Sequence, residues 1–363
     1  MRIDEFCTYA PKSTIKAGDA QPDGQYMFFT SSEDESKRYP DYQFDGEGII
    51  MGTGGNATLH YYNGRYAVST DCVVLLPDNR VRCKYLYYFF LANMHMLEAG
   101  FKGAGLKHTN KKYISNIEIE KVPSMFIQDK VIDTLDSLAK IIQMRNKQLS
   151  ILDDVIKIRF VEMFGDVIQN NKGWAQYVFS DIATSRLGKM LDTKKQTGMY
   201  KFPYLANFNV QWFRFELGNL NEMDFNDADQ KEFELREGDL LVCEGGEIGR
   251  CAVWHNEVQP CYFQKALHRV RCDKSIVLPE YLARWFQYNC EHGGFASIEG
   301  AKATIAHLPG AKLKILKVTV PPINAQEQFF DFVSHIDKSK QLVQKALDEA
   351  QLLFNSLMQQ YFG

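Results

Sequence analysis

The sequence lacks the features that would assign it to several familiar classes of protein. Its eight cysteines form no C-x-x-C pair, and scattered cysteines in a 363-residue chain are typical of reduced, mostly buried thiols rather than of a zinc site. No apolar run approaches the roughly 20 residues that a membrane-spanning helix needs, and the first residues contain no signal-peptide core. We therefore expect a cytoplasmic protein.

Catalytic and nucleotide-binding signatures are missing as well. The glycines at Gly54 and Gly245 are not followed by the Lys-Ser/Thr of a P-loop, and the sequence contains no H-x-x-x-H pair and no G-x-S-x-G. The segment 320–323, Val-Pro-Pro-Ile, lacks the amide or acid of the Asn/Asp-Pro-Pro-aromatic motif of amino-methyltransferases. Nothing in the sequence argues for catalysis or for a metal site in this chain.

An excess of positive charge is also absent. The chain has 42 Lys and Arg against 45 Asp and Glu, a net charge of −3, whereas a domain that binds nucleic acid by itself is usually basic. Any nucleic-acid binding must therefore depend on local basic patches or on a larger assembly. The composition, 45% hydrophobic and 24% charged, is ordinary for globular proteins, and the length allows two or three domains.

The sequence does contain an internal repeat. Five stretches of the first half recur in the same order in the second half, while the offset between the copies grows from 174 to 198 residues. In the first copy they begin at Gly24, Gly48, Tyr85, Gly105 and Val122, and in the second copy at Gly198, Asp239, Tyr281, Gly300 and Val320. Because the order is kept while the spacing drifts, we infer a duplicated unit whose loops differ in length.

Each copy is predicted to end in a long helix. After Pro123 the chain has no Gly or Pro until Gly165, and the same pattern follows Pro322. Seven of the nine heptad a and d positions counted from Leu135 are apolar, and eight of nine counted from Val333. This seam predicts coiled-coil packing. A helix of about 40 residues is ~60 Å long, so we expect the two helices to pair with each other, antiparallel because the chain must return.

The remaining segments are expected to form two α/β or mostly β modules. Short apolar runs beside glycines, such as Asp239–Cys243, indicate strands, and Pro279–Phe286 indicates a helix that the first copy repeats near Tyr85. The predicted fold class is α+β, with two repeated α/β modules and two long helices that form an antiparallel coiled coil. The predicted divisions are a module at 1–122, a helix at 123–166, a module at 167–320 and a helix at 321–363.

This organisation resembles the specificity subunit of type I restriction–modification enzymes. Each module of that family ends in Val/Ile-Pro followed by four residues and a Gln that leads into the helix, as in Val122–Gln128 and Val320–Gln326 here. The second copy is close to the family's Pro-Pro-Leu-x-Glu-Gln form, whereas the first has Ser124 in place of the second Pro. The stretch Gly238–Gly246, in which Gly-Asp-Leu-Leu-Val is followed by two glycines, also resembles the family's sequences. The first module, however, lacks a clear counterpart of Trp174–Ala183.

The resemblance implies that each module is a target recognition domain that reads one half of a split double-stranded DNA target. The helices would set the spacing and dock two methyltransferase subunits, and restriction subunits would join that core. Adenine N6 methylation and DNA cleavage would belong to these partners, which would hold S-adenosylmethionine, ATP and Mg²⁺. This chain would then have no catalytic residue and no cofactor, and its two different modules would read different half-sites.

Two alternatives remain on the sequence alone. One is a non-DNA scaffold that presents two ligand-binding modules on a coiled coil, which the slightly acidic charge favours. The other is an enzyme with its site between the modules.

Candidate DNA contacts lie in three places, and at each the alternative is a tight turn or a solvated surface. A repeated Gly-x-Lys-x-Thr loop has Lys and Thr, which suit phosphate oxygens, and Gly, which allows close backbone approach. The glycine loops differ between the copies, and their Asn, Arg and Glu could read adenine, guanine and cytosine respectively. The third place is a basic run in the second module.

The candidates of the Gly-x-Lys-x-Thr loop and the residues after it are Lys107, His108, Thr109, Lys111 and Lys112, with Lys302 and Thr304 in the second copy. Those of the glycine loops are Thr53 and Asn56 in the first copy and Glu244, Glu247 and Arg250 in the second. The basic run consists of Arg186, Lys189, Lys194 and Lys195.

Overall fold

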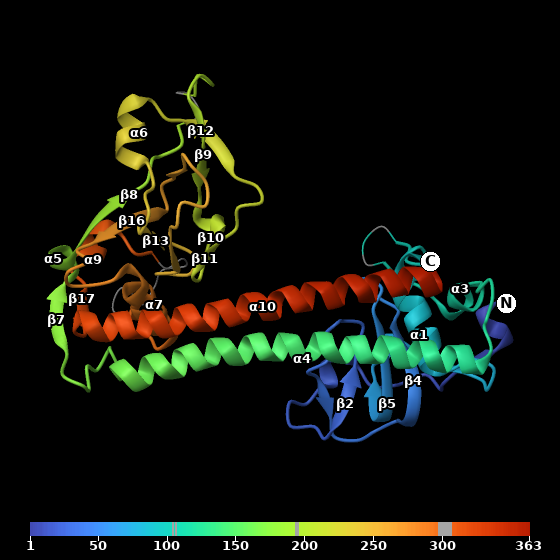
Figure 1. The fold of residues 1–363 in the computed structure, drawn as a ribbon. Helices are drawn as coiled ribbons and strands as arrows, with labels where there is room; N and C mark the ends of the chain where they lie inside the picture. The colour runs from blue at the N-terminus through green and yellow to red at the C-terminus, as the bar shows by residue number, and fades with distance from the viewer. Residues whose placement is uncertain (104, 106, 193–195, 297–306) are drawn as a thin grey trace. The chain divides into compact units, whose positions relative to one another are not determined.

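The computed structural model describes residues 1–103, 105, 107–192, 196–296 and 307–363 (Figure 1). The chain forms two compact units. Unit 1 consists of Met1–Gln148 and Val343–Gly363, and unit 2 of Leu149–Leu342. Each unit therefore contains one globular module together with part of both long helices.

The first module is built on a mixed six-stranded sheet with the strand order β1-β6-β4-β5-β2-β3. The strands are β1 (Cys7–Tyr9), β2 (Tyr26–Phe29), β3 (Arg38–Tyr39), β4 (Phe44–Gly52), β5 (Leu59–Val68) and β6 (Cys72–Pro77). All neighbours pair antiparallel except β2 and β5, which run parallel. The second half of β4, which contains the predicted apolar run, is buried, as its composition requires.

The second module repeats this strand order in two pieces. The strands are β8 (Ala183–Leu187), β9 (Lys201–Leu205), β12 (Asn221–Asp224), β13 (Leu240–Cys243), β14 (Cys251–Val253), β15 (Tyr262–Phe263) and β16 (Leu267–Cys272). The order β8-β16-β13-β14 matches β1-β6-β4-β5, and β15 pairs parallel with β9 as β5 does with β2. Residues 254–261 separate β14 from β15, where the first module has one continuous strand.

Shorter elements complete the modules. In the first module these are η1 (Ile3–Glu5), η2 (Ala17–Asp19), α1 (Cys83–Ala92), α2 (Met94–Glu98) and α3 (Lys111–Ser115). In the second they are β7 (Ala175–Val178), α5 (Phe179–Ile182), η4 (Asn207–Asn209), β10 (Val210–Gln211), β11 (Arg214–Phe215), α6 (Asp227–Phe233), α7 (Pro279–Glu291), α9 (Gly310–Lys314) and β17 (Lys317–Val320). Helices α1 and α7 are the predicted repeated pair, and each packs its aromatic face into the core of its module.

The opening of the first module corrects one expectation. The backbone N–H of Ile3 donates to Ile117 (3.0 Å), and that of Phe179 donates to Leu316 (2.8 Å). Ile3 and Phe179 stand four residues before β1 and β8, which occupy the same place in their sheets. The end of the segment 174–183 therefore has a counterpart at 3–7, which sequence similarity did not reveal because the side chains differ.

The two long helices follow the predicted heptads closely. Helix α4 spans Met125–Phe164 and α10 spans Ile323–Phe362, with 40 residues each. All eighteen predicted a and d positions are buried or half-buried. Unit 1 contains the start of α4 with the end of α10, and unit 2 contains the end of α4 with the start of α10, so the helices run antiparallel (Figure 1). The predicted antiparallel coiled coil is confirmed.

A buried glutamine fixes the start of helix α4 to the first module. The Gln128 side chain is fully buried. Its Oε1 accepts a hydrogen bond from the backbone N–H of Arg82 (2.7 Å), and its Nε2 donates to the carbonyls of Arg80 (3.1 Å) and Pro123 (2.9 Å). One amide thus satisfies three backbone groups, two of which precede helix α1.

Helix α10 is fixed to the second module by the same three contacts. Gln326 Oε1 accepts from the N–H of Leu278 (2.8 Å), and its Nε2 donates to the carbonyls of Ile276 (2.9 Å) and Pro321 (2.8 Å). The Gln of the repeated motif therefore has a structural role: it joins each long helix to the helix of its own module.

The far end of each long helix packs on the other module. The ring of Phe164, at the end of α4, lies 5.1 Å from Tyr281 of α7, and Phe362, at the end of α10, lies 5.1 Å from Tyr85 of α1. Asn93 Nδ2 also donates to the carbonyl of Phe362 (3.1 Å). Each module thus holds the start of one long helix and the end of the other.

Two expectations about composition can be compared with the structure. All eight cysteines are free thiols and six are buried. Within the described residues, no helix is both long enough and apolar enough to cross a bilayer.

Replacement of Gln128 or Gln326 by Leu should destabilise the protein by about 1–3 kcal/mol, because in each case three backbone groups lose their hydrogen-bond partner. The measurement is the urea unfolding midpoint of each variant. Gln143→Leu, at an exposed position of α4, is the matched control and should leave the midpoint nearly unchanged. Equal effects at all three positions would contradict the structural role given to the buried amides.

Candidate nucleic-acid interface

The glycine loop of the first module, residues 53–56, pairs with the segment that precedes helix α3. The N–H of Gly55 donates to the carbonyl of Lys107 (2.9 Å), and the N–H of Thr109 donates to the carbonyl of Thr53 (3.0 Å). Gly54 and His108 face each other in this short antiparallel bridge. The structure therefore brings together two segments that the sequence singled out separately.

A third segment joins this cluster from the turn after β2. Ser31 Oγ donates to the carbonyl of Gly54 (2.9 Å) and accepts from the N–H of the same residue (3.1 Å). The cluster of the first module thus consists of the turn after β2, the glycine loop and the segment before α3.

The second module assembles the same three segments. Gly245 of its glycine loop forms the bridge with His307, and the N–H of Leu308 donates to the carbonyl of Glu244 (2.6 Å). From the turn after β9, Asn207 Nδ2 donates to the carbonyl of Gly245 (3.0 Å). We call these two arrangements the three-segment clusters.

The backbone pairing gives a different register for the repeated loop from the one inferred from the sequence. The sequence pairs Lys107 and Thr109 with Lys302 and Thr304, which lie outside the described residues. The structure instead places His108 and His307 in equivalent positions, each opposite the first glycine of its loop. His307 was missed because the second loop is longer. A signal was present, since each histidine stands three residues before a short helix.

In the first cluster the candidate side chains divide into exposed and engaged groups. The exposed candidates are Asn56, Lys107, His108 and Lys112. Thr53 Oγ1 donates to the carbonyl of Asp71 (2.9 Å), whereas the buried Thr109 Oγ1 has no hydrogen-bond partner among the described residues. Lys111 Nζ lies 4.9 Å from the centre of the Tyr9 ring. The exposed group is the one that can reach a ligand without rearrangement.

In the second cluster the predicted readers contact one another. Glu247 Oε1 accepts from the indole N–H of Trp212 (2.7 Å), and Glu247 lies 3.6 Å from the Arg250 guanidinium. Arg250 also donates through Nη2 to the carbonyl of Asn207 (3.1 Å), and its side chain is only 17% exposed. Arg250 therefore fastens the turn after β9 to the glycine loop. Glu244 is half-buried and contributes its backbone to the cluster.

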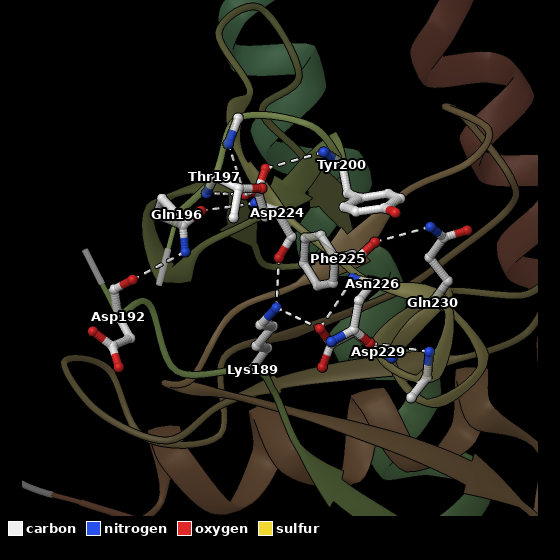
Figure 2. A network of polar contacts seen from close by, with 12 residues as sticks. Lys189, Asp192, Gln196, Thr197, Tyr200, Asp224, Phe225, Asn226, Asp229 and Gln230 are labelled. Atoms are coloured by element: carbon white, nitrogen blue, oxygen red, sulfur yellow. Dashed lines mark hydrogen bonds and ion pairs between the residues drawn. The ribbon is translucent and has the colours of Figure 1, made fainter. Parts of the chain in front are cut away.

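The basic run of the second module has acidic partners within the module. Arg186 pairs with Glu232. Lys189 Nζ lies 2.6 Å from the Asp229 carboxylate and also donates to the carbonyl of Asp224 (Figure 2). Lys194 and Lys195 lie outside the described residues. Both described side chains stabilise the module, a use that residue type alone did not indicate.

The network around Lys189 is centred on the carboxylate of Asp224, a buried residue. Its oxygens accept from the N–H groups of Thr197, Gly198 (2.8 Å) and Tyr200 (3.2 Å) and from the Thr197 hydroxyl (2.8 Å) (Figure 2). Burial acts to raise the pKa of Asp224, but these hydrogen bonds outweigh it and hold the pKa below the usual 3.8. The ionised carboxylate thus orders residues 197–200.

The depressed pKa predicts acid sensitivity of unit 2. The ionised carboxylate stabilises the fold fully above the unfolded pKa of about 4, and this contribution is lost as pH falls through the lower folded pKa. Asp224→Asn should therefore lower stability at pH 7, and its deficit relative to wild type should shrink below about pH 4. Thermal midpoints between pH 3 and 7 test this. Glu222→Gln, exposed on the same strand, should show no such convergence.

Comparison with known proteins identifies the family. The family model described as the type I restriction modification DNA specificity domain matches residues 1–152 and 171–352. This chain belongs to that family. The particular relatives include a putative type I restriction enzyme specificity subunit of Haemophilus influenzae, 24% identical over 346 residues, which cover 88% of this chain and 82% of that protein.

A second curated relative matches over a shorter stretch, and two solved structures match over the whole chain. The EcoDI specificity subunit of Escherichia coli is 22% identical over 202 residues, which cover 56% of this chain and 44% of that protein. Among solved structures, the type I restriction-modification S subunit of M. genitalium superposes with a TM-score of 0.67 at 13% identity, covering 100% of this chain and 95% of that one. A chain from a structural study of type I R-M complex assembly gives a TM-score of 0.53 at 13% identity, covering 100% and 96%. These structures support the fold.

Proposed function

We propose that this chain is the sequence-specific DNA-recognition subunit of a type I restriction–modification complex, in which each module reads one half of a bipartite target. The observation that carries this proposal is the pair of three-segment clusters. Both contain a bridge between a glycine and a histidine, and in both the residue after the histidine donates to the carbonyl of the residue before the glycine. Their side chains differ: Asn56 stands where the second module has Glu247, and Ser31 stands where it has Asn207. A shared frame with different loop side chains suits two readers of different sequences.

The proposed division of labour within a cluster follows from exposure. In the first module Lys107, His108 and Lys112 would contact phosphates, and Asn56 would read a base edge. In the second, His307 and Glu247 face solvent, while Lys302 and Thr304 remain proposed phosphate contacts. Arg250 and Lys189 would act indirectly, by holding the loops in place.

The long helices would set the spacing and dock the partners. We place the recognition modules at 1–122 and 167–320 and the spacer helices at 123–166 and 321–363. Several large apolar side chains of the two helices lie outside the heptad seam and are exposed. On α4 these are Ile141, Met144, Ile151 and Ile158, and on α10 they are Leu342, Leu352 and Leu353. Exposed apolar surface can mark a protein interface, and two methyltransferase subunits would cover these side chains.

The chemistry would belong to those partners. Adenine N6 methylation requires the target base to leave the helix and enter a methyltransferase pocket, so S-adenosylmethionine would be held there. Restriction subunits, where present, would use ATP and Mg²⁺ to cleave DNA. This chain would supply recognition without a catalytic residue, in the cytoplasm. With a net charge of −3, it should bind DNA weakly alone and tightly in the complex, since rigidly linked half-site contacts act together.

The test is co-expression with type I adenine methyltransferase subunits. We expect two methyltransferase subunits to copurify per chain, and the complex to protect a split DNA site. Equal binding to all duplexes at every salt concentration would contradict the proposal. Partner binding without any DNA binding would favour the scaffold alternative instead.

Substitutions in the first cluster separate positioning from reading. Lys107→Ala should weaken binding to all sequences about equally and lower the salt dependence by about one released ion, because a phosphate contact is lost. Asn56→Ala should relax specificity at the first half-site alone. The measurement is fluorescence anisotropy with the complex at several salt concentrations. Lys121→Ala, an exposed lysine of the same module outside the cluster, is the control.

A further inference from the structure

The turn after β9 presents an exposed phenylalanine among mostly buried residues. Phe208 is 56% exposed, whereas Asn209 is 1% and Leu205 0% exposed. A single exposed apolar side chain is common on protein surfaces, so exposure alone says little. The rigidity of the turn and its place in the second three-segment cluster are what distinguish Phe208.

The turn is held by a buried amide. Asn209 Oδ1 accepts from the backbone N–H of Ala206 (2.9 Å), and Asn209 Nδ2 donates to the carbonyl of Glu216 (2.9 Å). Gln211 Nε2 donates to the carbonyl of Phe208 itself (3.0 Å). Because movement of the turn would break hydrogen bonds of a buried amide, the backbone at Phe208 is rigid.

The same turn is fastened to the glycine loop by two further contacts at Asn207. Its side chain donates to the carbonyl of Gly245 (3.0 Å), and its own carbonyl accepts from Arg250 (3.1 Å). Gly245 in turn faces the exposed His307. Phe208 therefore projects from the segment that contacts the loop proposed to approach DNA.

We propose that Phe208 is a specificity-determining wedge, which inserts at a base step of the second half-site and partly unstacks it. This inference rests on the proposed function. Apolar wedges of this kind unstack base steps and kink DNA, and aromatic–base stacking repays part of the cost. A rigid aromatic side chain loses little conformational entropy on insertion. Base steps that unstack easily would be preferred at this position, even without a hydrogen bond to the bases.

The first module has no aromatic side chain at the equivalent position. Ser31 occupies the place of Asn207 in its cluster, so the residue equivalent to Phe208 is Ser32, whose hydroxyl bonds the Thr30 hydroxyl (2.9 Å). A serine is too short to enter a base stack. The two half-sites are therefore read in different ways, the first without and the second with a deformation of the base stack.

The experiment uses the complete complex with its methyltransferase subunits. Its target is found by mapping methylated adenines in the host genome. Duplexes then carry 2-aminopurine at successive positions of the second half-site, or of the first for comparison. With wild type, we expect a fluorescence increase from base flipping at the target adenine of each half-site, and a further increase at one other step of the second half-site only. Phe208→Ala and Phe208→Ser should abolish this further increase and weaken binding on the order of 10-fold, while Phe208→Trp should retain both.

The controls separate this inference from the proposed function. Met199→Ala removes another exposed apolar side chain of the same module, 75% exposed, and should change neither signal. If Phe208→Ala binds and unstacks DNA like wild type, the wedge is wrong although recognition stands. If Phe208→Ala reduces copurification of the methyltransferase instead, Phe208 belongs to a protein interface and the wedge is again wrong. A wild-type complex without sequence preference would overturn both proposals.

Discussion

The structure of each unit depends on a buried glutamine amide at the start of a long helix. Gln128 and Gln326 each join three backbone groups, and these hydrogen bonds fix the start of each helix to its own module. The seam and the aromatic contacts at the helix ends can then form in one register.

Much of this architecture was predictable because it is encoded locally. A heptad pattern and the proline and glycine at its ends indicate a helix within a few residues, and α4 at 125–164 lies inside the predicted 123–166. The sheets were less accessible, because strand pairing joins segments far apart in the chain. The split of one long strand into β14 and β15, and the equivalence of Ile3 with Phe179, follow from backbone pairing that the side chains do not reveal.

The candidate site shows the same division. In the first module the glycines and the repeated motif marked two of the three segments that converge, whereas the repeated motif of the second module lies outside the described residues. The turns at Ser31 and Asn207 were not marked, because their ordinary polar residues carry no signal. The positive charge of a side chain did not indicate whether that side chain is free to contact DNA. Lys189 and Arg250 were chosen as basic, yet each is held by groups that lie close only after folding, such as Asp229, which is 40 residues from Lys189.

Each module holds the start of one long helix and the end of the other, and this arrangement has a consequence for how such a protein can evolve. Each half consists of one module and one long helix, and the glutamine and aromatic contacts that hold the helix ends are the same in both halves. The chain is therefore organised like two copies of one subunit that have been joined into one polypeptide. In a true homodimer both subunits share one sequence, and any change in one reader occurs in both. Covalent fusion removes this constraint. One half can acquire a phenylalanine such as Phe208 while the other keeps a serine, and the helices that both halves need remain unchanged.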